Sequence, residues 1–198
     1  MVSDETISEV AQQLLTNIEE QQVWPKRDGD RTIQLRLVLS EAASKCGLTE
    51  DHGFRQYDKY EKKKWGGEWM NIDFWWWEEN ENGKQGWLSA ESQWWNERWP
   101  PERNREAILE DFQKLPSLKS HIKLMVFNSD KESGDTLIRE FDNYLSGFLQ
   151  HTGGECYLVV RFDRNKYACA WRSTVDGSQK AGKFEPFQPR SGNGGQQA

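Results

Sequence analysis

The chain has 198 residues, a net charge of −6 and 35% hydrophobic residues, so it is long enough for one domain with a buried core. Aromatic residues are frequent, and no run approaches the roughly 18 apolar residues of a membrane-spanning helix. The acidic, polar N-terminus predicts no secretory signal, and we expect a cytoplasmic protein without membrane contact. The negative charge argues against a broadly basic nucleic-acid-binding face but is compatible with local basic patches.

The first part of the chain predicts two helices and a strand. Apolar residues recur at helical spacing in residues 4–22. Residues 32–46 fit a strand by simple alternation and a helix by their i, i+3, i+4 pattern. Gly47, directly after the last apolar position, favours the helix. After a loop, residues 54–62 predict a strand.

Residues 71–95 predict the centre of the fold, a β-hairpin of two tryptophan-rich strands. Asn82-Gly83 favours a tight turn, because both residues tolerate the positive φ of a type I′ turn. Side chains alternate along a strand, so this turn places Asp73 nearly opposite Glu91 and Ser92. Opposed residues on one face have Cβ atoms roughly 4.5–5.5 Å apart. Two carboxylates at that separation repel unless a cation lies between them, and a divalent metal ion is the usual solution.

The second part of the chain predicts a helix that ends at Pro116, a buried strand, another helix and a second hairpin. The expected elements span residues 102–115, 121–128, 134–150, 155–162 and 166–173. Together these elements predict a single α/β domain over residues 1–175 with its core at 32–128. The rest of the chain, residues 176–198, is rich in Gly, Ser and Gln, so we expect a mobile, disordered tail. The three cysteines are odd in number and widely spaced, which favours buried free thiols over disulfides or a zinc site.

The element order α–β–β–β–α–β over residues 32–128 resembles the core of the PD-(D/E)xK nuclease superfamily, which includes restriction endonucleases and Holliday-junction resolvases. Asp73 matches the first acid of the family motif. Glu91-Ser92-Gln93 matches its second part, with Gln93 in the place of the usual lysine, as in some restriction enzymes. The segment Asp111–Leu115 is similar to a D-F-x-K-L segment of uncharacterised bacterial members. The resemblance implies a mixed, twisted sheet flanked by helices with a restriction-endonuclease-like core.

The resemblance also implies an activity, namely metal-dependent hydrolysis of nucleic-acid phosphodiester bonds, with DNA as the favoured substrate. Mg²⁺ or Mn²⁺ would be the cofactor, held by Asp73, Glu91 and the backbone carbonyl of Ser92. Such a metal ion stabilises charge on the phosphate and activates a water. Small members of the superfamily include bacterial defence proteins and often act as homodimers, so a homodimer is a further implication.

The family motif normally supplies a positive charge through its lysine, which is Gln93 in this chain, so another residue would have to supply that charge. Gln93 can hold a water by hydrogen bonds but supplies no charge. Lys114, on the helix that follows the hairpin, is the nearest candidate for that charge. Glu41, on the preceding helix, matches the place where some members carry a further acid.

These features also have plainer interpretations. An acid in a strand is usually solvent-facing, and Lys62–Lys64 is either a solvated segment or a phosphate contact. Most tryptophans are expected in the core, while Trp94, Trp95 and Trp99 fit a core, base stacking or a protein-binding patch. Two alternatives to an enzyme follow. One is a catalytically inactive nuclease-fold protein that acts as a binding or protein-interaction module, and the other is an unrelated sensor in which the two acids only structure the sheet.

Overall fold

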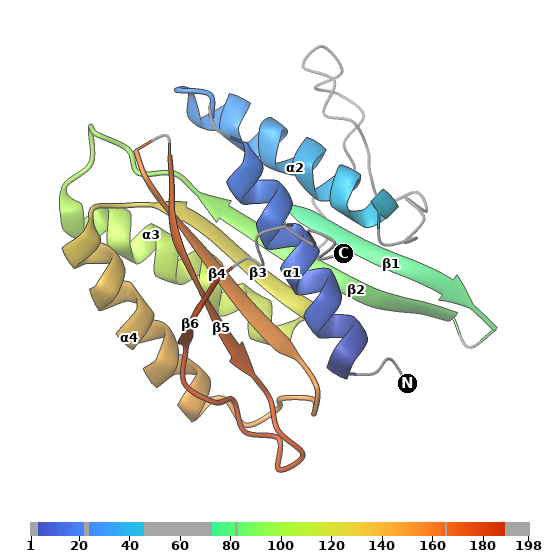
Figure 1. Ribbon diagram of the computed structural model, residues 1–198. Helices are drawn as coiled ribbons and strands as arrows, with labels where there is room; N and C mark the ends of the chain where they lie inside the picture. Colours follow the sequence, from blue (N-terminus) through green and yellow to red (C-terminus); the bar gives the residue numbers. More distant parts are fainter. Residues whose placement is uncertain (1–3, 22–23, 46–72, 82, 165, 189–198) are drawn as a thin grey trace, which may run out of the picture.

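The computed structural model describes residues 4–21, 24–45, 73–81, 83–164 and 166–188 (Figure 1). These residues form a six-stranded sheet in the order β1-β2-β3-β4-β5-β6. The strands span Phe74–Asn80 (β1), Gly83–Gln93 (β2), Ser120–Asn128 (β3), Cys156–Asp163 (β4), Lys166–Thr174 (β5) and Glu185–Phe187 (β6). The twist of this sheet and the helices around it confirm the predicted α/β class.

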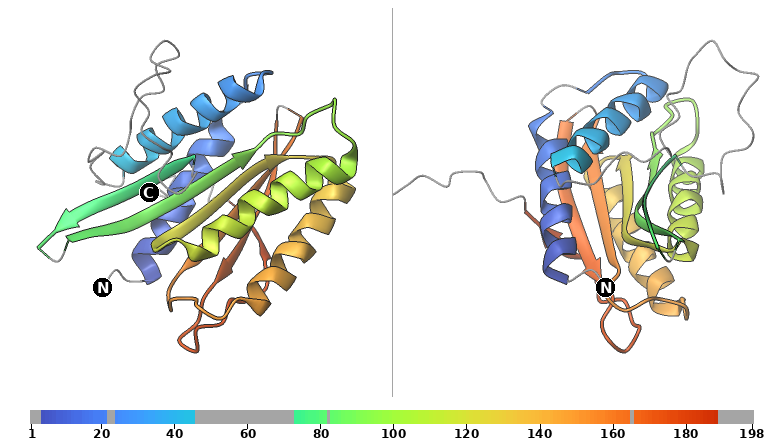
Figure 2. Two further views of the ribbon diagram at one scale, coloured as in Figure 1. Left: turned by 180° about the vertical axis from the view of Figure 1, so that it is seen from behind. Right: turned by 90° about the vertical axis from the view of Figure 1, so that its right-hand side faces the viewer.

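Helices cover both faces of the sheet (Figure 2). α1 (Asp4–Glu20) and α2 (Asp28–Lys45) pack on one face, and α3 (Pro101–Lys114) and α4 (Lys131–Gly147) pack on the other. A 3-10 turn, η2 (Leu115–Ser117), follows α3. The sheet is mixed, because β2, β3 and β4 are parallel while the remaining pairs are antiparallel. Parallel neighbours need a crossover connection, and α3 and α4 supply the two that are required here.

The two N-terminal helices agree with the periodicity of the sequence. The apolar positions predicted for the first helix are buried in α1 (Ile7, Val10, Leu14, Leu15 and Ile18). In α2 the residues Leu35, Val38 and Leu39 are buried, whereas Ile33 and Leu37 are exposed, so the pattern is helical and the strand alternative is wrong. α2 begins at Asp28 rather than residue 32, with acidic residues in its first turn that suit the positive end of the helix dipole. The strand predicted at 54–62 lies outside the described residues.

The predicted central hairpin is present as β1 and β2, with a shifted turn. Asn80 pairs with Gly83, so Gly83 is the first residue of β2 instead of a turn residue. A bulge between Trp76 and Trp77 then changes the register, and Phe74 pairs with Ala90. Asp73 directly precedes β1, and continuing this register places it level with Glu91, as the sequence predicts.

The C-terminal elements follow the prediction with small changes at their ends. α4 begins at Lys131 rather than residue 134, because the Asp130 side chain caps it by accepting a 2.7 Å hydrogen bond from the Ser133 amide. The predicted second hairpin is β4 and β5, and Arg164 between them adopts a positive φ of 56°. Cys156 is a buried free thiol and Cys169 a part-buried one, whereas Cys46 lies outside the described residues.

Part of the segment predicted as a disordered tail is folded onto the domain, which corrects that prediction. β6 pairs with β5, with Phe187 opposite Ala170. Phe184 is buried, and its amide donates a 2.8 Å hydrogen bond to Asp142 on α4. The Gly-rich segment therefore contains two phenylalanines, Phe184 and Phe187, that pack on α4 and on the sheet. Residues 189–198 are outside the described part. None of the described helices has the length and apolarity to cross a membrane.

Candidate active site

Asp73 directly precedes β1, which is the first strand in the sheet formed by the described residues. Its Oδ2 accepts two hydrogen bonds from Ser92, from the amide at 2.9 Å and from the hydroxyl at 2.6 Å. Its Oδ1 faces the guanidinium of Arg36 on α2, with Nη2 at 4.0 Å. One carboxylate oxygen is therefore held by Ser92 of β2, and the other is at the outer limit of an ion pair with Arg36.

Glu91 lies on the sheet face that α3 covers, because it pairs with Met125, which packs under that helix layer. Only 2% of Glu91 is exposed, and its Oε1 accepts no hydrogen bond in the described part of the chain. Burial, assisted by the charge of Asp73, raises the pKa of Glu91 to about 8, although the charge of Lys114 acts in the opposite direction. Glu91 is therefore a buried acid whose Oε1 has the Lys114 ammonium, 3.3 Å away, as an ion-pair partner.

Lys114 joins two acids from its position at the end of α3. Its Nζ lies 2.6 Å from Asp111 Oδ1 and 3.3 Å from Glu91 Oε1. Burial alone would lower the pKa of Lys114, but these two acids reverse the effect and raise it. Burial raises the pKa of Asp111, and the hydrogen bond from Lys114 opposes that change. The predicted cation thus reaches the motif acid, and Asp111 holds it there.

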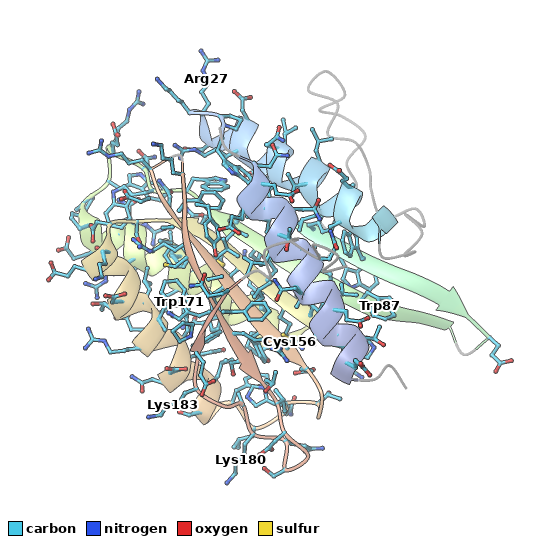
Figure 3. All side chains as sticks on the ribbon, in the orientation of Figure 1. Arg27, Trp87, Cys156, Trp171, Lys180 and Lys183 are labelled. Carbon is cyan, nitrogen blue, oxygen red and sulfur yellow. The ribbon has the colours of Figure 1, made fainter. Side chains whose placement is uncertain are left out.

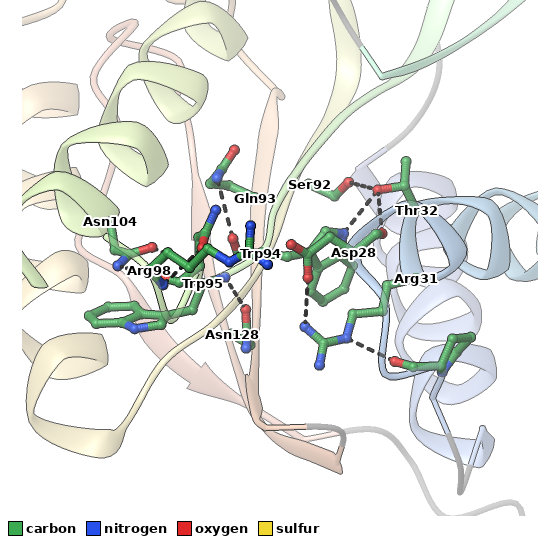
Figure 4. A network of polar contacts seen from close by, with 12 residues as sticks. Asp28, Arg31, Thr32, Ser92, Gln93, Trp94, Trp95, Arg98, Asn104 and Asn128 are labelled. Atoms are coloured by element: carbon green, nitrogen blue, oxygen red, sulfur yellow. Dashed lines mark hydrogen bonds and ion pairs between the residues drawn. The ribbon is translucent and has the colours of Figure 1, made fainter. Parts of the chain in front are cut away.

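A polar junction between α2 and β2 fixes Ser92, which in turn holds Asp73. The hydroxyls of Thr32 and Ser92 lie 3.2 Å apart, and Trp94 Nε1 donates to Thr32 Oγ1 at 2.9 Å (Figure 4). The Arg31 guanidinium lies over the Trp94 ring, 5.4 Å from its centre. This end of β2 lies near Arg27, at the opposite end of the molecule from the loop that carries Lys180 (Figure 3).

A second set of polar contacts fixes the chain between β2 and α3. The Trp95 amide donates to Asn128 Oδ1 at the end of β3. The Asn96 amide donates to Asn104 Oδ1 at 2.7 Å, and Asn104 Nδ2 donates back to the Asn96 carbonyl at 3.1 Å (Figure 4). Because Asn104 belongs to α3, these contacts set the start of the helix that carries Lys114.

The remaining predicted residues lie outside this group of contacts. Gln93 shares the face of Glu91, but its amide donates weakly, at 3.4 Å, to the Trp94 carbonyl. Glu41 is exposed on α2, and the contacts described around Asp73 and Glu91 do not include it.

The tryptophans that the sequence left open have different environments. Trp94 is buried, Trp95 is part-buried, and Trp99 is 38% exposed. The Arg103 guanidinium lies over the Trp99 ring, 5.5 Å from its centre. Trp94 is therefore a core residue. Lys62–Lys64 lie outside the described residues.

Sequence reasoning missed Arg36 and the contact between Asp111 and Lys114. The first brings α2 to the start of β1, a contact that depends on how the helix packs across the sheet. The second follows helix spacing, because residues three apart are neighbours on a helix surface, and this signal was present in the sequence.

Asp73 and Glu91 could hold a divalent cation only with few protein ligands. Among the described residues, no group of three or more His, Cys, Asp or Glu side chains is placed to hold a metal ion. Mg²⁺, however, usually binds through one or two carboxylates and keeps several waters. Glu91 Oε1, which lies 3.3 Å from Lys114, and Asp73 Oδ1, which lies 4.0 Å from Arg36, are the carboxylate oxygens that could contribute to such a site.

Comparison of the chain with models of known protein families, with curated proteins and with solved structures finds no match. The α/β architecture therefore rests on the structure alone, and the nuclease superfamily is a proposal argued from the site.

Proposed function

We propose that this protein is a metal-dependent nuclease that hydrolyses phosphodiester bonds of nucleic acid, with DNA as the favoured substrate. The observation that carries the proposal is Glu91, a buried acid whose Oε1 is paired with Lys114 and which lies close enough to Asp73 for the two charges to interact. A buried carboxylate is unfavourable unless it is paired or binds a metal ion, and the described cation beside Glu91, Lys114, is shared with Asp111. The motif order in the sequence supports the same assignment.

Each side chain has a distinct part in this proposal. Asp73 and Glu91 would bind Mg²⁺ or Mn²⁺, together with the Ser92 carbonyl. A bound divalent ion supplies Lewis-acid stabilisation of the phosphate and a water of lowered pKa. The amide and hydroxyl of Ser92 orient Asp73 from one side. Lys114 places a positive charge where Gln93 has none, and this charge stabilises the negative charge that develops on the phosphate.

The first test is metal binding by wild type and by Glu91→Ala, with Mg²⁺ and Mn²⁺ titrated calorimetrically. We expect the binding heat of the wild type to disappear in the variant, and cleavage of plasmid and oligonucleotide substrates to disappear with it. Glu106→Ala is the matched control, because Glu106 is an exposed glutamate on α3. A wild type that neither binds metal nor cleaves either substrate would rule out the enzyme.

A second candidate is a catalytically inactive protein of the same fold that binds nucleic acid or a protein. Asp73 supports this alternative, because its Oδ2 is already satisfied by Ser92, and so does the uncharged Gln93. Nucleic-acid affinity that persists in Glu91→Ala, combined with the absence of metal binding in the wild type, would favour the binding protein. Binding of neither metal nor nucleic acid would leave only a protein partner.

A further inference from the structure

Arg36 on α2 is a second cation at the candidate active site, and its guanidinium has few partners there. Its Nη2 lies 4.0 Å from Asp73 Oδ1, at the outer limit of an ion pair. Its Nε is buried without a hydrogen-bond partner among the residues described. A guanidinium presents N–H donors in a planar fork that matches the oxygens of a carboxylate or a phosphate. Among the described residues, the contact to Asp73 is the one ion pair of this guanidinium, and it is long.

Arg36 reaches the site from the helix layer opposite to that of Lys114. α2 packs on one face of the sheet and α3 on the other (Figure 2), so Arg36 contacts Asp73 from one helix layer and Lys114 contacts Glu91 from the other. The side chains of Arg36, Asp73 and Lys114 retain 23%, 31% and 36% of their exposure. The two cations therefore border the acidic pair at a place that solvent, and hence a larger anion, can reach.

Thr32 supports the position of Arg36, because the two residues are one helical turn apart on α2. Thr32 contacts Ser92 through its hydroxyl, and Arg36 contacts Asp73, so the same face of α2 meets both halves of the motif. The Thr32 contact fixes the helix relative to β2, and the Arg36 guanidinium is thereby held within 4.0 Å of Asp73.

We propose that Arg36 binds a backbone phosphate of the nucleic acid at this site, with its guanidinium donating to non-bridging phosphate oxygens. This inference rests on the proposed nuclease function and adds a substrate-binding residue to it. An acidic pair alone repels a phosphate, and the chain as a whole carries a net charge of −6. Arg36 and Lys114 supply the local positive charge that a polyanion needs to approach Asp73 and Glu91.

A purely structural role for Arg36 makes a different prediction. If Arg36 only neutralised Asp73, its removal would change folding stability and metal affinity but would leave the salt dependence of nucleic-acid binding unchanged. A phosphate contact releases a counterion, and log K therefore falls as log salt concentration rises. Loss of one contact makes this negative slope shallower, by about 0.7 for single strands and about 0.9 for duplex DNA. The slope therefore separates the two roles.

The experiment measures the binding of fluorescein-labelled single-stranded and duplex oligonucleotides by anisotropy, at several salt concentrations, in EDTA and again in Ca²⁺. Arg36→Met is expected to bind roughly tenfold more weakly, with a slope lower by about one contact. Arg36→Lys is expected to restore the slope, because it restores the charge. Arg139→Met on α4 is the control and is expected to match wild type, because Arg139 is exposed and its hydrogen bonds to described residues lie within its own helix.

The outcomes separate this inference from the nuclease proposal. An unchanged slope in Arg36→Met overturns the phosphate contact even if the wild type cleaves DNA. A shallower slope in Arg36→Met than in wild type supports the contact. If the wild type also shows no metal-dependent cleavage, the contact stands and the nuclease is rejected. A wild type that binds neither oligonucleotide in either buffer overturns the contact. If Arg36→Met loses cooperative unfolding in urea, Arg36→Gln replaces it, with the same expected slope.

Discussion

Glu91 is an acid in a buried place, where a negative charge is unfavourable unless a cation balances it. It is nearly fully buried, and the only described cation beside it, Lys114, is shared with Asp111. Burial and the charge of Asp73 raise the pKa of Glu91 to about 8, so the metal-free protein holds a proton on this acid at neutral pH. A divalent cation at Glu91 would have to displace that proton, which makes the residue a link between metal binding and pH.

The same pKa predicts how the stability of the metal-free protein depends on pH. Between about 4.5 and 8 the folded protein keeps the Glu91 proton that the unfolded chain releases, so the free energy of unfolding falls as pH rises. At roughly 1.4 kcal/mol per pH unit, the two pKa values correspond to a loss of at most about 5 kcal/mol. Glu91→Gln, which resembles the protonated acid, is expected to remove most of this dependence.

Urea unfolding in EDTA at pH 5, 6.5 and 8 measures this effect. Asp73, Asp111 and Lys114 are unchanged in Glu91→Gln, so the difference between the two proteins isolates Glu91. Glu106→Gln on the exposed side of α3 is the control and should follow the wild-type curve. Parallel curves for wild type and Glu91→Gln would show that the Glu91 pKa is close to its ordinary value.

At the scale of elements, β3 and β4 share a buried ion pair that the sequence did not indicate. Lys123 is fully buried on β3, with Nζ 2.7 Å from Glu155 Oε1 and 3.1 Å from the Ser120 carbonyl. The Tyr157 hydroxyl donates to Glu155 at 3.4 Å and lies 3.1 Å from Nδ1 of His151. Burial lowers the pKa of Lys123, while the charge of Glu155 opposes that change. Loss of either partner would therefore leave the other as a buried charge without compensation.

Removing one partner of this pair is expected to cost more stability than removing both. Glu155→Gln leaves a buried lysine without its counter-charge, and we expect a loss of about 3–5 kcal/mol in the free energy of unfolding. The double variant Lys123→Met/Glu155→Gln removes both charges and should recover most of that loss. Urea unfolding at pH 7 measures both values. A single variant within about 1 kcal/mol of wild type would show that water or a neighbouring group replaces Glu155.

The elements themselves were predictable where one pattern was strong and local. The apolar stripe of α1, the hairpin of the apolar segments β4 and β5 and the turn signal near Gly83 depend on neighbours in sequence. Helix ends were less accurate, because the cap at Asp130 begins α4 before its first apolar residue. The bulge between Trp76 and Trp77 was also missed, because no residue at this position indicates a bulge in the sequence.

The candidate site was likewise predictable where its residues lie close together in the sequence. Asp73 and Glu91 belong to one hairpin, so local register brings them together. Lys114 could be inferred from the order of elements, since its helix directly follows β2. Arg36 could not, because α2 meets β1 through packing between distant segments, and a helix pattern gives the buried face but not the strand that it will contact.

At the scale of the whole molecule, the C-terminal segment closes the second core. Phe184 packs against the rings of Phe112 on α3 and Phe141 on α4, with centroids 6.2 and 6.4 Å away. Those two rings stack on each other at 3.9 Å. One side chain from the end of the described chain thus contacts both helices that cover this face, including the helix that carries Lys114.

Phe184 is therefore expected to contribute to global stability although its segment is rich in Gly and Ser. Phe184→Ala should lower the free energy of unfolding by about 3 kcal/mol, because it removes a buried ring and leaves a cavity between α3 and α4. Phe184→Leu keeps most of the apolar volume and should cost less than about 1.5 kcal/mol. Both are measured by urea unfolding with the wild type in parallel. A Phe184→Ala protein as stable as wild type would mean that the segment rests on the domain without supporting it, and α3 would then depend on its contacts with the sheet and α4 alone.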